Sequence, residues 1–277
     1  MYNYHSHTHY CDGINAPEDY VQAAIRAGMK VYGFSSHIPL KQGKSDWNMP
    51  QERFKEYIDE IYRLKEKYKE EIEILCGLEG DYLYGFKLRN ELRADHPQVD
   101  YVVGSIHYLH PPDADVMWEI DGSLEKFNSG LNLYYSGNVR NVVEAYFRLS
   151  CEMLNHERPE ILGHADKIKI HGLFDENESW YKNAWKALLD VTAETGTVLE
   201  INTRGLYTGR CEDFYPSKEM IREAIQLGIP IQLSSDAHQP AEIMANFSYA
   251  AEFLRFAGLR SFRIIKNGSW QDVELFG

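Results

Sequence analysis

Cysteine is scarce in this chain, and long hydrophobic runs are missing. The four cysteines lie far apart among 277 residues and form no C-x-x-C pair. No apolar stretch approaches the roughly 20 residues that a helix needs to span a bilayer. The start, MYNYH, has neither the basic nor the apolar segment of a secretory signal peptide. We therefore expect free thiols, no membrane partner and a cytoplasmic location.

Positive charge is also in short supply. Lys and Arg number 29 against 42 Asp and Glu, which gives a formal net charge of -13. Affinity for a nucleic-acid backbone rests on clustered Lys and Arg, so this balance argues against a nucleic-acid partner. A small phosphorylated substrate remains compatible with an acidic chain, because bound cations attract phosphate.

No linker rich in Pro, Gly or Ser divides the chain. Hydrophobic residues make up 44% of it and charged residues 26%, a balance typical of globular proteins. A chain of this length can bury a sizeable core, and α/β barrels often reach it undivided. We therefore expect a single domain over residues 1–277.

Short apolar runs alternate along the chain with longer amphipathic stretches. This alternation predicts parallel strands joined by crossover helices, hence an α/β fold of the (β/α) barrel type. The predicted strands are 2–5, 31–36, 72–79, 101–107, 161–164, 197–202 and 230–235. The predicted helices are 17–28, 50–70, 86–94, 139–156, 178–195, 217–228 and 240–257. Residues 110–136 are expected to form a long loop, and 262–266 a further strand.

Histidines and carboxylates recur where these predicted strands end. The residues in question are His5, His7, His37, Glu79, His107, His164, Asp236 and His238. The carboxyl ends of parallel barrel strands meet on one face, where active sites lie, so we expect these side chains around one cavity. Two histidines in an H-x-H pair also point to the same side of a strand. The pattern predicts a metal cluster.

The donor set holds imidazoles and carboxylates but no thiolate. Such a set suits Zn, Mn or Fe in a hydrolytic site better than a closed structural zinc site. The two oxygens of Glu79 could bridge a pair of ions. Two ions roughly 3.5–4 Å apart can activate a shared water and clamp a phosphoryl group.

Seven motifs in this order carry a family resemblance: HSHTH, SSHIP, GLEGD, GSIHYL, GHADK, INTRGL and SSDAH, between residues 5 and 238. The chain resembles the PHP (polymerase and histidinol phosphatase) superfamily, and GSIHYL and NTRGL resemble its stand-alone histidinol-phosphate phosphatases. The resemblance implies the PHP fold, a distorted (β/α)7 TIM-like barrel, with a trinuclear centre of divalent ions. It also implies a histidine-biosynthesis phosphatase that hydrolyses L-histidinol phosphate by attack of a metal-bridging hydroxide.

The resemblance also implies a ligand set for each ion. The first ion would take His5, His7, Glu79 and Asp236. The second would share Glu79 and add His107 and His164. The third would take His37, His238 and a residue from the loop after His7. Many relatives have a histidine where this chain has Gly13, so Asp12, one residue earlier, is assigned here.

His9 and Asp81 lie beside the ligand motifs without belonging to them. His9 would share a face with His7 only if the strand continued, and a turn is expected near Thr8. Asp81, two residues beyond Glu79, is expected to orient a histidine ligand. His96, His110, His156 and His171 lie outside the motifs and are expected to be exposed or capping residues.

The substrate is expected to be held at both ends. The expected catalytic residues are Glu79, Asp236 and Arg204, with Asp236 or a metal-bound water protonating the leaving group. Arg204 can grip phosphate through its planar guanidinium, and Lys167 is a second candidate. Trp118 and Glu119, together with Asp121, are expected to suit a cationic amine or an imidazole; a solvated loop with one packed Trp is the alternative.

Three other readings are open from the sequence. An amidohydrolase-type C–N hydrolase also begins with H-x-H, but usually carries its bridging residue on the fourth strand rather than the third. A PHP phosphoesterase could act on a different phosphomonoester or on a phosphodiester. A non-enzymatic PHP module usually lacks several ligands, whereas here only the Asp12 position departs from the pattern.

Overall fold

A parallel sheet forms the centre of the molecule. The computed structural model describes residues 1–40, 46–83, 96–112 and 114–275. Seven parallel strands lie in the order β1-β2-β3-β4-β7-β8-β9. They are β1 (Tyr2–Asn3), β2 (Val31–Phe34), β3 (Glu73–Asp81), β4 (Tyr101–Ser105), β7 (Ile161–Leu162), β8 (Val198–Asn202) and β9 (Ile231–Ser234). Each overlaps one of the seven predicted strands, so the predicted strands are confirmed.

The sheet closes on itself just beyond the ends of its first and last strands. Ser6 and Ala237 form a parallel bridge. In it, the backbone N–H of His7 donates to the Ala237 carbonyl over 2.8 Å. The predicted barrel with seven parallel strands is therefore confirmed, and closure brings the segments after β1 and β9 together.

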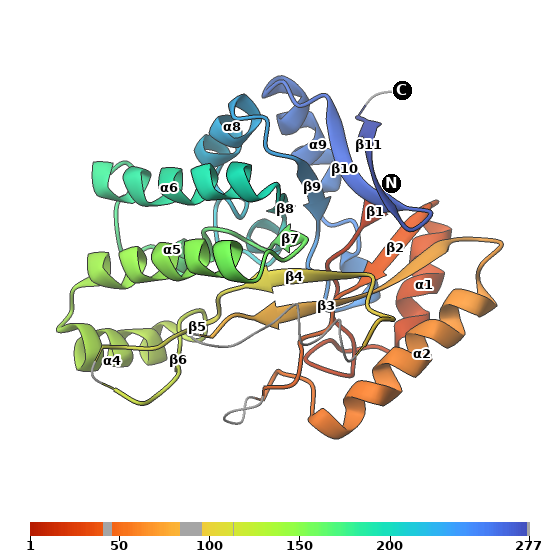
Figure 1. The fold of residues 1–277 in the computed structure, drawn as a ribbon, viewed down its shortest axis with the longest axis horizontal. Helices are drawn as coiled ribbons and strands as arrows, with labels where there is room; N and C mark the ends of the chain where they lie inside the picture. The colour runs from red at the N-terminus through yellow and green to blue at the C-terminus, as the bar shows by residue number, and fades with distance from the viewer. Residues whose placement is uncertain (41–45, 84–95, 113, 276–277) are drawn as a thin grey trace.

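The helices surround this barrel, as Figure 1 shows, with α5 and α6 side by side on one flank and α1 and α2 on the opposite flank. They are α1 (Pro17–Arg26), α2 (Phe54–Lys67), α5 (Val139–His156), α6 (Ser179–Thr195), α8 (Lys218–Gln226) and α9 (Phe247–Phe256). Two short 3-10 turns, η1 (Gln51–Arg53) and η3 (Pro240–Glu242), precede α2 and α9. These confirm six predicted helices, and the predicted helix 86–94 lies outside the described residues. None of the described helices combines the length and apolarity needed to cross a membrane.

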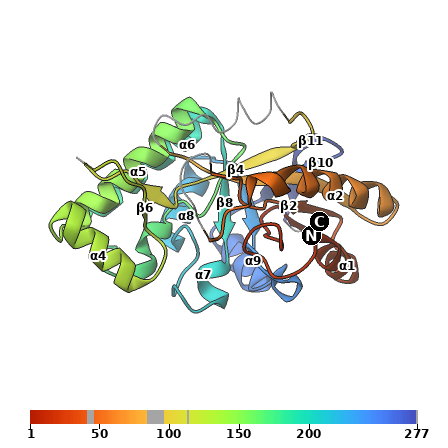
Figure 2. The same ribbon diagram turned by 90° about the horizontal axis from the view of Figure 1, so that it is seen from below.

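The prediction of a long loop over 110–136 is wrong for much of its length. Strand β5 (Tyr108–Leu109) pairs with β6 (Trp118–Glu119), and α4 (Leu124–Tyr135) follows. The Ser123 hydroxyl caps α4 by accepting from the Lys126 N–H. Gly130 lets the helix approach Trp118, since a Cβ there would lie 2.2 Å from the indole nitrogen. Figure 2 shows α4 beside β6 and α5. This tertiary contact, rather than local periodicity, stabilises the segment.

The C-terminal part forms a hairpin over the other end of the barrel. Strand β10 (Ser261–Lys266) confirms the predicted strand at 262–266 and pairs with β11 (Ser269–Glu274), which was not predicted. Ile264 and Ile265 are buried against the barrel interior, and the Tyr4 hydroxyl donates to the Ile265 carbonyl over 3.0 Å. The hairpin thus covers the end of the barrel opposite the predicted ligands.

Two apolar clusters stabilise the barrel. The larger lies between strands and helices, and the smaller fills the barrel interior around Tyr4, Val103 and Tyr101. The Tyr101 hydroxyl donates to the carbonyls of Tyr4 and Phe34. Gly77 gives its ring room, since a Cβ there would lie 2.2 Å from a Tyr101 ring carbon. The polar cluster described next lies above this packed interior.

Two further short elements follow barrel strands. The 3-10 turn η2 (Lys167–His171) follows β7, and the single-turn helix α7 (Arg204–Tyr207) follows β8. Both begin at a residue expected to bind phosphate. They fix where Lys167 and Arg204 enter the site.

Candidate metal centre

Glu79 lies at the centre of a ring of histidines. Its Oε2 atom lies 3.1 Å from His5 Nε2 and 3.3 Å from His7 Nε2. Its other oxygen, Oε1, lies 2.9 Å from His164 Nε2 and 3.6 Å from His107 Nε2. One carboxylate therefore faces two groups of imidazoles with different oxygens, as a bridging ligand must.

Asp236 joins the first of these groups. Its Oδ1 atom lies 3.2 Å from His7 Nε2 and 3.8 Å from His5 Nε2. The structure thus brings His5, His7, Glu79 and Asp236 together from three strands. Its second oxygen accepts a hydrogen bond from the Asn202 amide over 3.2 Å. Both oxygens of Asp236 have partners, which favours a role as a metal ligand over a role as a proton donor.

A third group forms around Asp12. Its Oδ2 atom lies 2.9 Å from His238 Nε2, and its Oδ1 atom lies 3.4 Å from His7 Nδ1 and 4.0 Å from His37 Nε2. His37 also reaches the centre, with Nδ1 3.2 Å from Glu79 Oε2. Asp12 and His238 are close as expected, while His7 lies nearer to Asp12 than His37 does.

Gly13 explains why the loop after His7 offers Asp12 instead. A Cβ at position 13 would lie 2.3 Å from the His7 backbone carbonyl. Residues 11 and 13 both donate backbone hydrogen bonds to the Thr8 carbonyl, which makes the turn tight. A histidine side chain has no room at position 13 in this turn.

Several ring nitrogens in the cluster are buried without a hydrogen-bond partner among the described residues. They are Nε2 of His5, Nε2 of His7, Nδ1 of His37 and Nδ1 of His164. A buried polar atom without a partner is costly unless something absent from the protein satisfies it. Imidazole nitrogens aimed at carboxylates form a donor set that binds divalent cations. The side chains therefore fit divalent metal ions as the cofactors.

The charges of the cluster are mutually dependent. Burial opposes the charged form of Glu79, but His37, His5 and His107 hold the pKa of its carboxyl well below its usual range. Burial also lowers the pKa of His5, yet the carboxylates of Glu200 and Glu79 raise it to about 10. The anionic carboxylates and the imidazoles thus need one another or a cation.

Two proposed ligands have strained backbones. His164 has a φ of 22° and Asp236 a φ of 53°, both in the region that non-glycine residues rarely adopt. Strain of this kind persists where the surrounding structure holds it, commonly at functional sites. Here the two residues follow β7 and β9 directly, and the backbone turns each side chain into the cluster.

Two carboxylates orient the histidines from behind. Asp81 Oδ1 lies 2.5 Å from His107 Nδ1, which confirms that it orients a histidine. Glu200 Oε1 lies 2.6 Å from His5 Nδ1, a role that was not predicted. A carboxylate there places the proton on Nδ1 and leaves Nε2 free to bind an ion. The sequence feature that could have indicated this role is the presence of an acid, Glu200, within the apolar run VLEIN.

A cavity of about 190 Å³ opens above the cluster. The described residues that line it are Asp12, His37, Trp47, Glu79, His107, Glu119, Asp121, Gly122, Lys167, Arg204, Arg210, Asp236 and His238. Most of its lining is charged or polar. It is therefore suited to a small charged molecule rather than an apolar one.

Arg204 enters this cavity beside the third group. Its Nη1 atom lies 2.7 Å from His238 Nδ1, 2.9 Å from the Asp236 carbonyl and 3.3 Å from the Tyr207 hydroxyl. His238 Nδ1 also lies 3.0 Å from the Asp236 carbonyl, so a proton on Nδ1 can donate to that carbonyl and leave Nε2, which faces Asp12, free to bind an ion. The Tyr207 hydroxyl, in the same single-turn helix, also donates to the Asp236 carbonyl over 3.0 Å.

Lys167 and two acids line the other side of the cavity. Lys167 Nζ forms an ion pair with Asp121 Oδ2 over 2.8 Å, and that oxygen lies 4.0 Å from His107 Nε2. Glu119 lines the cavity nearby, and burial raises the pKa of its carboxyl. Arg210 holds this segment by donating to the Asp121 and Gly122 carbonyls.

Trp118 does not take the place expected of it. It is 7% exposed and packs against Phe127 and Tyr135, and it is not among the described residues that line the cavity. Side chains alternate along β6, so Trp118 points away where Glu119 points in. The aromatic residue of the cavity is Trp47, stacked on Tyr108 with an interplanar angle of 8°.

Of the remaining histidines, His110 and His156 are exposed as expected, whereas His96 is half-buried. His9 stacks on Tyr10 and lies 3.3 Å from the Asn15 carbonyl, and it is in none of the ligand groups found among the described residues. His96 packs edge-on against Phe54, and His110 is 44% exposed. His171 is partly buried as well, and its Nε2 lies 3.1 Å from the Ile120 carbonyl.

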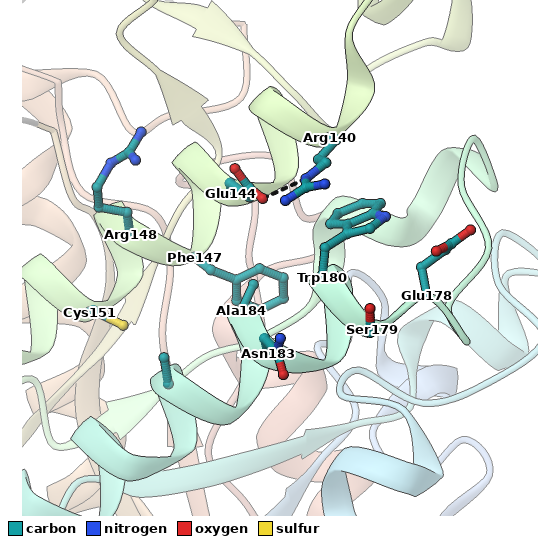
Figure 3. Close-up of a pocket in the computed structure, with 11 residues that line it drawn as sticks. Arg140, Glu144, Phe147, Arg148, Cys151, Glu178, Ser179, Trp180, Asn183 and Ala184 are labelled. Atoms are coloured by element: carbon teal, nitrogen blue, oxygen red, sulfur yellow. Dashed lines mark hydrogen bonds and ion pairs between the residues drawn. The ribbon is translucent and has the colours of Figure 1, made fainter.

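A larger surface pocket of about 670 Å³ lies elsewhere, between α5 and α6 (Figure 3). Arg140 pairs there with Glu144 over 2.7 Å and lies over the Trp180 ring. None of the residues that line it belongs to the ligand groups. Size alone therefore does not mark the functional site of this chain.

The chain is similar to known proteins in both sequence and fold. The model of the PHP domain family matches residues 3–204, which include most of the cluster. The chain belongs to the PHP domain family. This membership favours the PHP reading over the amidohydrolase-type alternative.

Relatives of this PHP chain match it nearly end to end. A Deinococcus radiodurans protein named "Probable histidinol-phosphatase" is 30% identical over 93% of this chain and 94% of its own length. The Listeria monocytogenes hisK crystal structure has a TM-score of 0.81 at 24% identity, covering 90% of this chain and 99% of its own.

A second similar crystal structure is that of a complex with ligands. It is the histidinol phosphate phosphatase of Lactococcus lactis, complexed with Zn, L-histidinol and phosphate. Its TM-score is 0.74 at 21% identity, and it covers 98% of each chain. At these identities the two structures support the barrel fold of the PHP chain.

Proposed function

We propose that this PHP chain is a metal-dependent histidinol-phosphatase, which hydrolyses L-histidinol phosphate to L-histidinol and phosphate in histidine biosynthesis. The observation that carries the proposal is the Glu79 carboxylate, whose two oxygens face two different sets of histidines beside a charged cavity. The relative named for this activity, matched over 93% of the chain, supports the choice of substrate.

Three groups of side chains would hold the ions. The first is His5, His7, Glu79 and Asp236, the second is Glu79, His107 and His164, and the third is Asp12, His37 and His238, with His7 close to Asp12. When bound, Zn, Mn or Fe ions in such sites activate water and neutralise charge on a phosphoryl group. Glu79 shares its charge between the first two groups and thereby keeps them adjacent.

The phosphate end of the substrate would lie against Arg204 and Lys167. Both cations line the cavity beside the cluster, and the Arg204 guanidinium is held at a fixed angle by Tyr207 and the Asp236 carbonyl. A planar guanidinium suits two phosphate oxygens at once. Lys167 is already paired with Asp121, so Arg204 is the stronger of the two candidates.

The amine or imidazole end would lie against Glu119 and Asp121. Both acids line the same cavity as Arg204, and Trp47 adds an aromatic face. A cationic group gains from carboxylates and from the face of an indole. The cavity therefore offers Arg204 on one side for the phosphate end, and Glu119 and Asp121 on the other side for the amine end, where Lys167 is paired with Asp121.

Asp236 would act as a ligand and as an acceptor. Its two oxygens are engaged by His7 and by Asn202, and burial is outweighed by His5 and Arg204, which hold the pKa of its carboxyl well below its usual range. An acid of this kind stays charged at neutral pH. It is therefore suited to binding an ion as a carboxylate rather than to donating a proton.

Turnover after metal removal tests this proposal. The protein is dialysed against a chelator and assayed with histidinol phosphate, phenyl phosphate, bis-p-nitrophenyl phosphate and a hydantoin-type amide. We expect loss of activity, its return with Zn, Mn, Fe or Co, and the highest kcat/KM for histidinol phosphate. Full activity in metal-free protein would overturn the metal requirement, and preference for the diester or the amide would overturn the substrate.

Two coarser proposals accompany the function. We place the enzyme in the cytoplasm, supported by four cysteines that are all free thiols. Residues 1–277 are proposed to act as one domain, supported by the C-terminal hairpin that packs against the barrel interior.

A further inference from the structure

Strand β8 supplies none of the proposed ligands, yet its side chains touch them. Glu200 and Asn202 are two residues apart, so both point to the same side of the strand. Each is fully buried, with 0% exposure. They lie beside ligands that come from the strands on either side and from β1.

Glu200 uses both oxygens. Oε1 accepts from His5 Nδ1 over 2.6 Å, and Oε2 accepts from the backbone N–H of His164 over 2.8 Å. His5 belongs to the first proposed ion and His164 to the second. Because His164 has a φ of 22°, the hydrogen bond to its N–H fixes an unfavourable backbone angle.

Asn202 extends this contact to the last strand. Its amide nitrogen donates to Glu200 Oε2 over 3.1 Å and to Asp236 Oδ2 over 3.2 Å. Its amide oxygen accepts from the Arg204 backbone N–H over 2.9 Å, which fixes the orientation of the amide. The Asn202 backbone is itself held by two hydrogen bonds with Tyr215.

We propose that Glu200 and Asn202 are positioning residues that couple the first two ion sites. One carboxylate holds a ligand of each site, and the adjacent amide ties that carboxylate to Asp236. Ligands from β1, β7 and β9 are thereby oriented by a single pair on β8. The inference rests on the ion-binding part of the proposed function.

The hydrogen bonds of Glu200 and Asn202 can be disrupted by substitutions that keep the size of each side chain. Glu200 receives three N–H groups, from His5, His164 and Asn202. A carboxylate accepts at both oxygens, whereas a glutamine of the same shape has one oxygen and one NH2 group. Glu200→Gln must therefore set a donor against a donor without changing volume. Asn202→Asp has the converse effect, since it replaces the donating amide by a carboxylate that faces the acceptor oxygens of Glu200 and Asp236.

Zinc affinity, measured by competition with a chromophoric chelator, tests the proposal without any turnover assay. We expect Glu200→Gln and Asn202→Asp to lose about 10–100-fold in affinity for two of the bound ions. Gln232→Met is the matched control, since Gln232 pairs in register with Glu200, is 1% exposed and belongs to no ligand group. Its zinc affinity should equal that of the unchanged chain.

Unfolding midpoints separate positioning from plain structural support. Positioning predicts that added zinc raises the unfolding midpoint of Glu200→Gln less than it raises the midpoint of the unchanged chain, in addition to any loss that metal-free Glu200→Gln already shows from its buried hydrogen bonds. An equal loss of unfolding midpoint with and without zinc, relative to the unchanged chain, would overturn the proposal. A zinc affinity of Glu200→Gln equal to that of the unchanged chain would also overturn it. If Glu200→Gln does not fold, Asn202→Asp decides by the same readouts. An unchanged chain that holds no zinc would instead overturn the proposed function, and this inference with it.

Discussion

Asp12 and His238 lie 226 positions apart in the chain, yet Asp12 Oδ2 is 2.9 Å from His238 Nε2. The Ser6–Ala237 bridge that closes the barrel brings the two loops together. The third proposed ion site therefore exists only because the first and last strands meet. Its loop ligand is a carboxylate because Gly13 leaves no room for a side chain.

Asp12→Ala should remove one ion from the protein. The substitution deletes the carboxylate that faces His238 and His7, whereas Glu79 and its two groups stay intact. We expect metal analysis of the purified protein to show one ion fewer than in the unchanged chain. His9→Ala, in the same loop but outside the ligand groups, is the control and should keep all ions. Loss of every ion from Asp12→Ala would contradict an independent third site.

Glu79→Gln should lose ions and turnover together. An amide cannot offer a negative oxygen to each of two sites, and five histidines would face it without a counter-charge. We expect two ions to be lost and kcat to fall by more than about 100-fold. Metal analysis and steady-state kinetics check both. Full metal content in this variant would argue against a bridging role.

Glu119→Gln should change selectivity rather than chemistry. Its side chain lies in the cavity but in none of the ligand groups found among the described residues. Loss of a charged contact typically costs about 1.5–3 kcal/mol, so kcat/KM for histidinol phosphate should fall by about 10–100-fold. Phenyl phosphate, which has no amine, should be hydrolysed as before. An equal fall for both substrates would contradict amine recognition by Glu119.

Alanine substitutions at Trp118 and Trp47 should affect different properties: stability for Trp118 and substrate binding for Trp47. Trp118→Ala empties a packed space beside Phe127 and Gly130, so the free energy of unfolding should fall by about 3–5 kcal/mol. Trp47→Ala should raise KM, because Trp47 lines the cavity. Urea unfolding and steady-state kinetics separate the two effects. A raised KM for folded Trp118→Ala with normal stability would contradict this assignment.

Glu18 should make stability depend on pH in the acid range. Hydrogen bonds from Lys67, Tyr68 and Arg63 lower the pKa of its carboxyl to about 2, from an unfolded value near 4.5. A lowered folded pKa stabilises the fold above pH 4.5, and this contribution is lost as the pH falls towards 2.

The size of this effect is modest, because the ion pairs lie at the surface. We expect Glu18→Gln to lower the free energy of unfolding at pH 7 by about 1 kcal/mol or less. The difference should narrow between pH 5 and pH 3 in denaturant titrations. Glu70→Gln makes the same charge change at an exposed position and should show no such trend.

Local patterns were enough to predict the strands and most helices of the barrel. Apolar runs of a few residues separated by amphipathic stretches specify alternating strands and helices wherever the chain stands. The strand and helix within 110–136 were not predicted because α4 and β6 stabilise each other, through the packing of Trp118 against Gly130. A packing contact between two elements produces no hydrophobic periodicity in the sequence of either element.

The sequence by itself determined which side chains could bind ions, because ligand types recur at the ends of strands that must share one face. Only the tertiary structure decided which atoms meet. Barrel closure joined Asp12 to His238, alternation along β6 turned Trp118 away and Glu119 inward, and Lys167 found a partner in Asp121. Glu200 gained its role in the same way, since hydrogen bonds depend on distances in space that position along the chain does not encode.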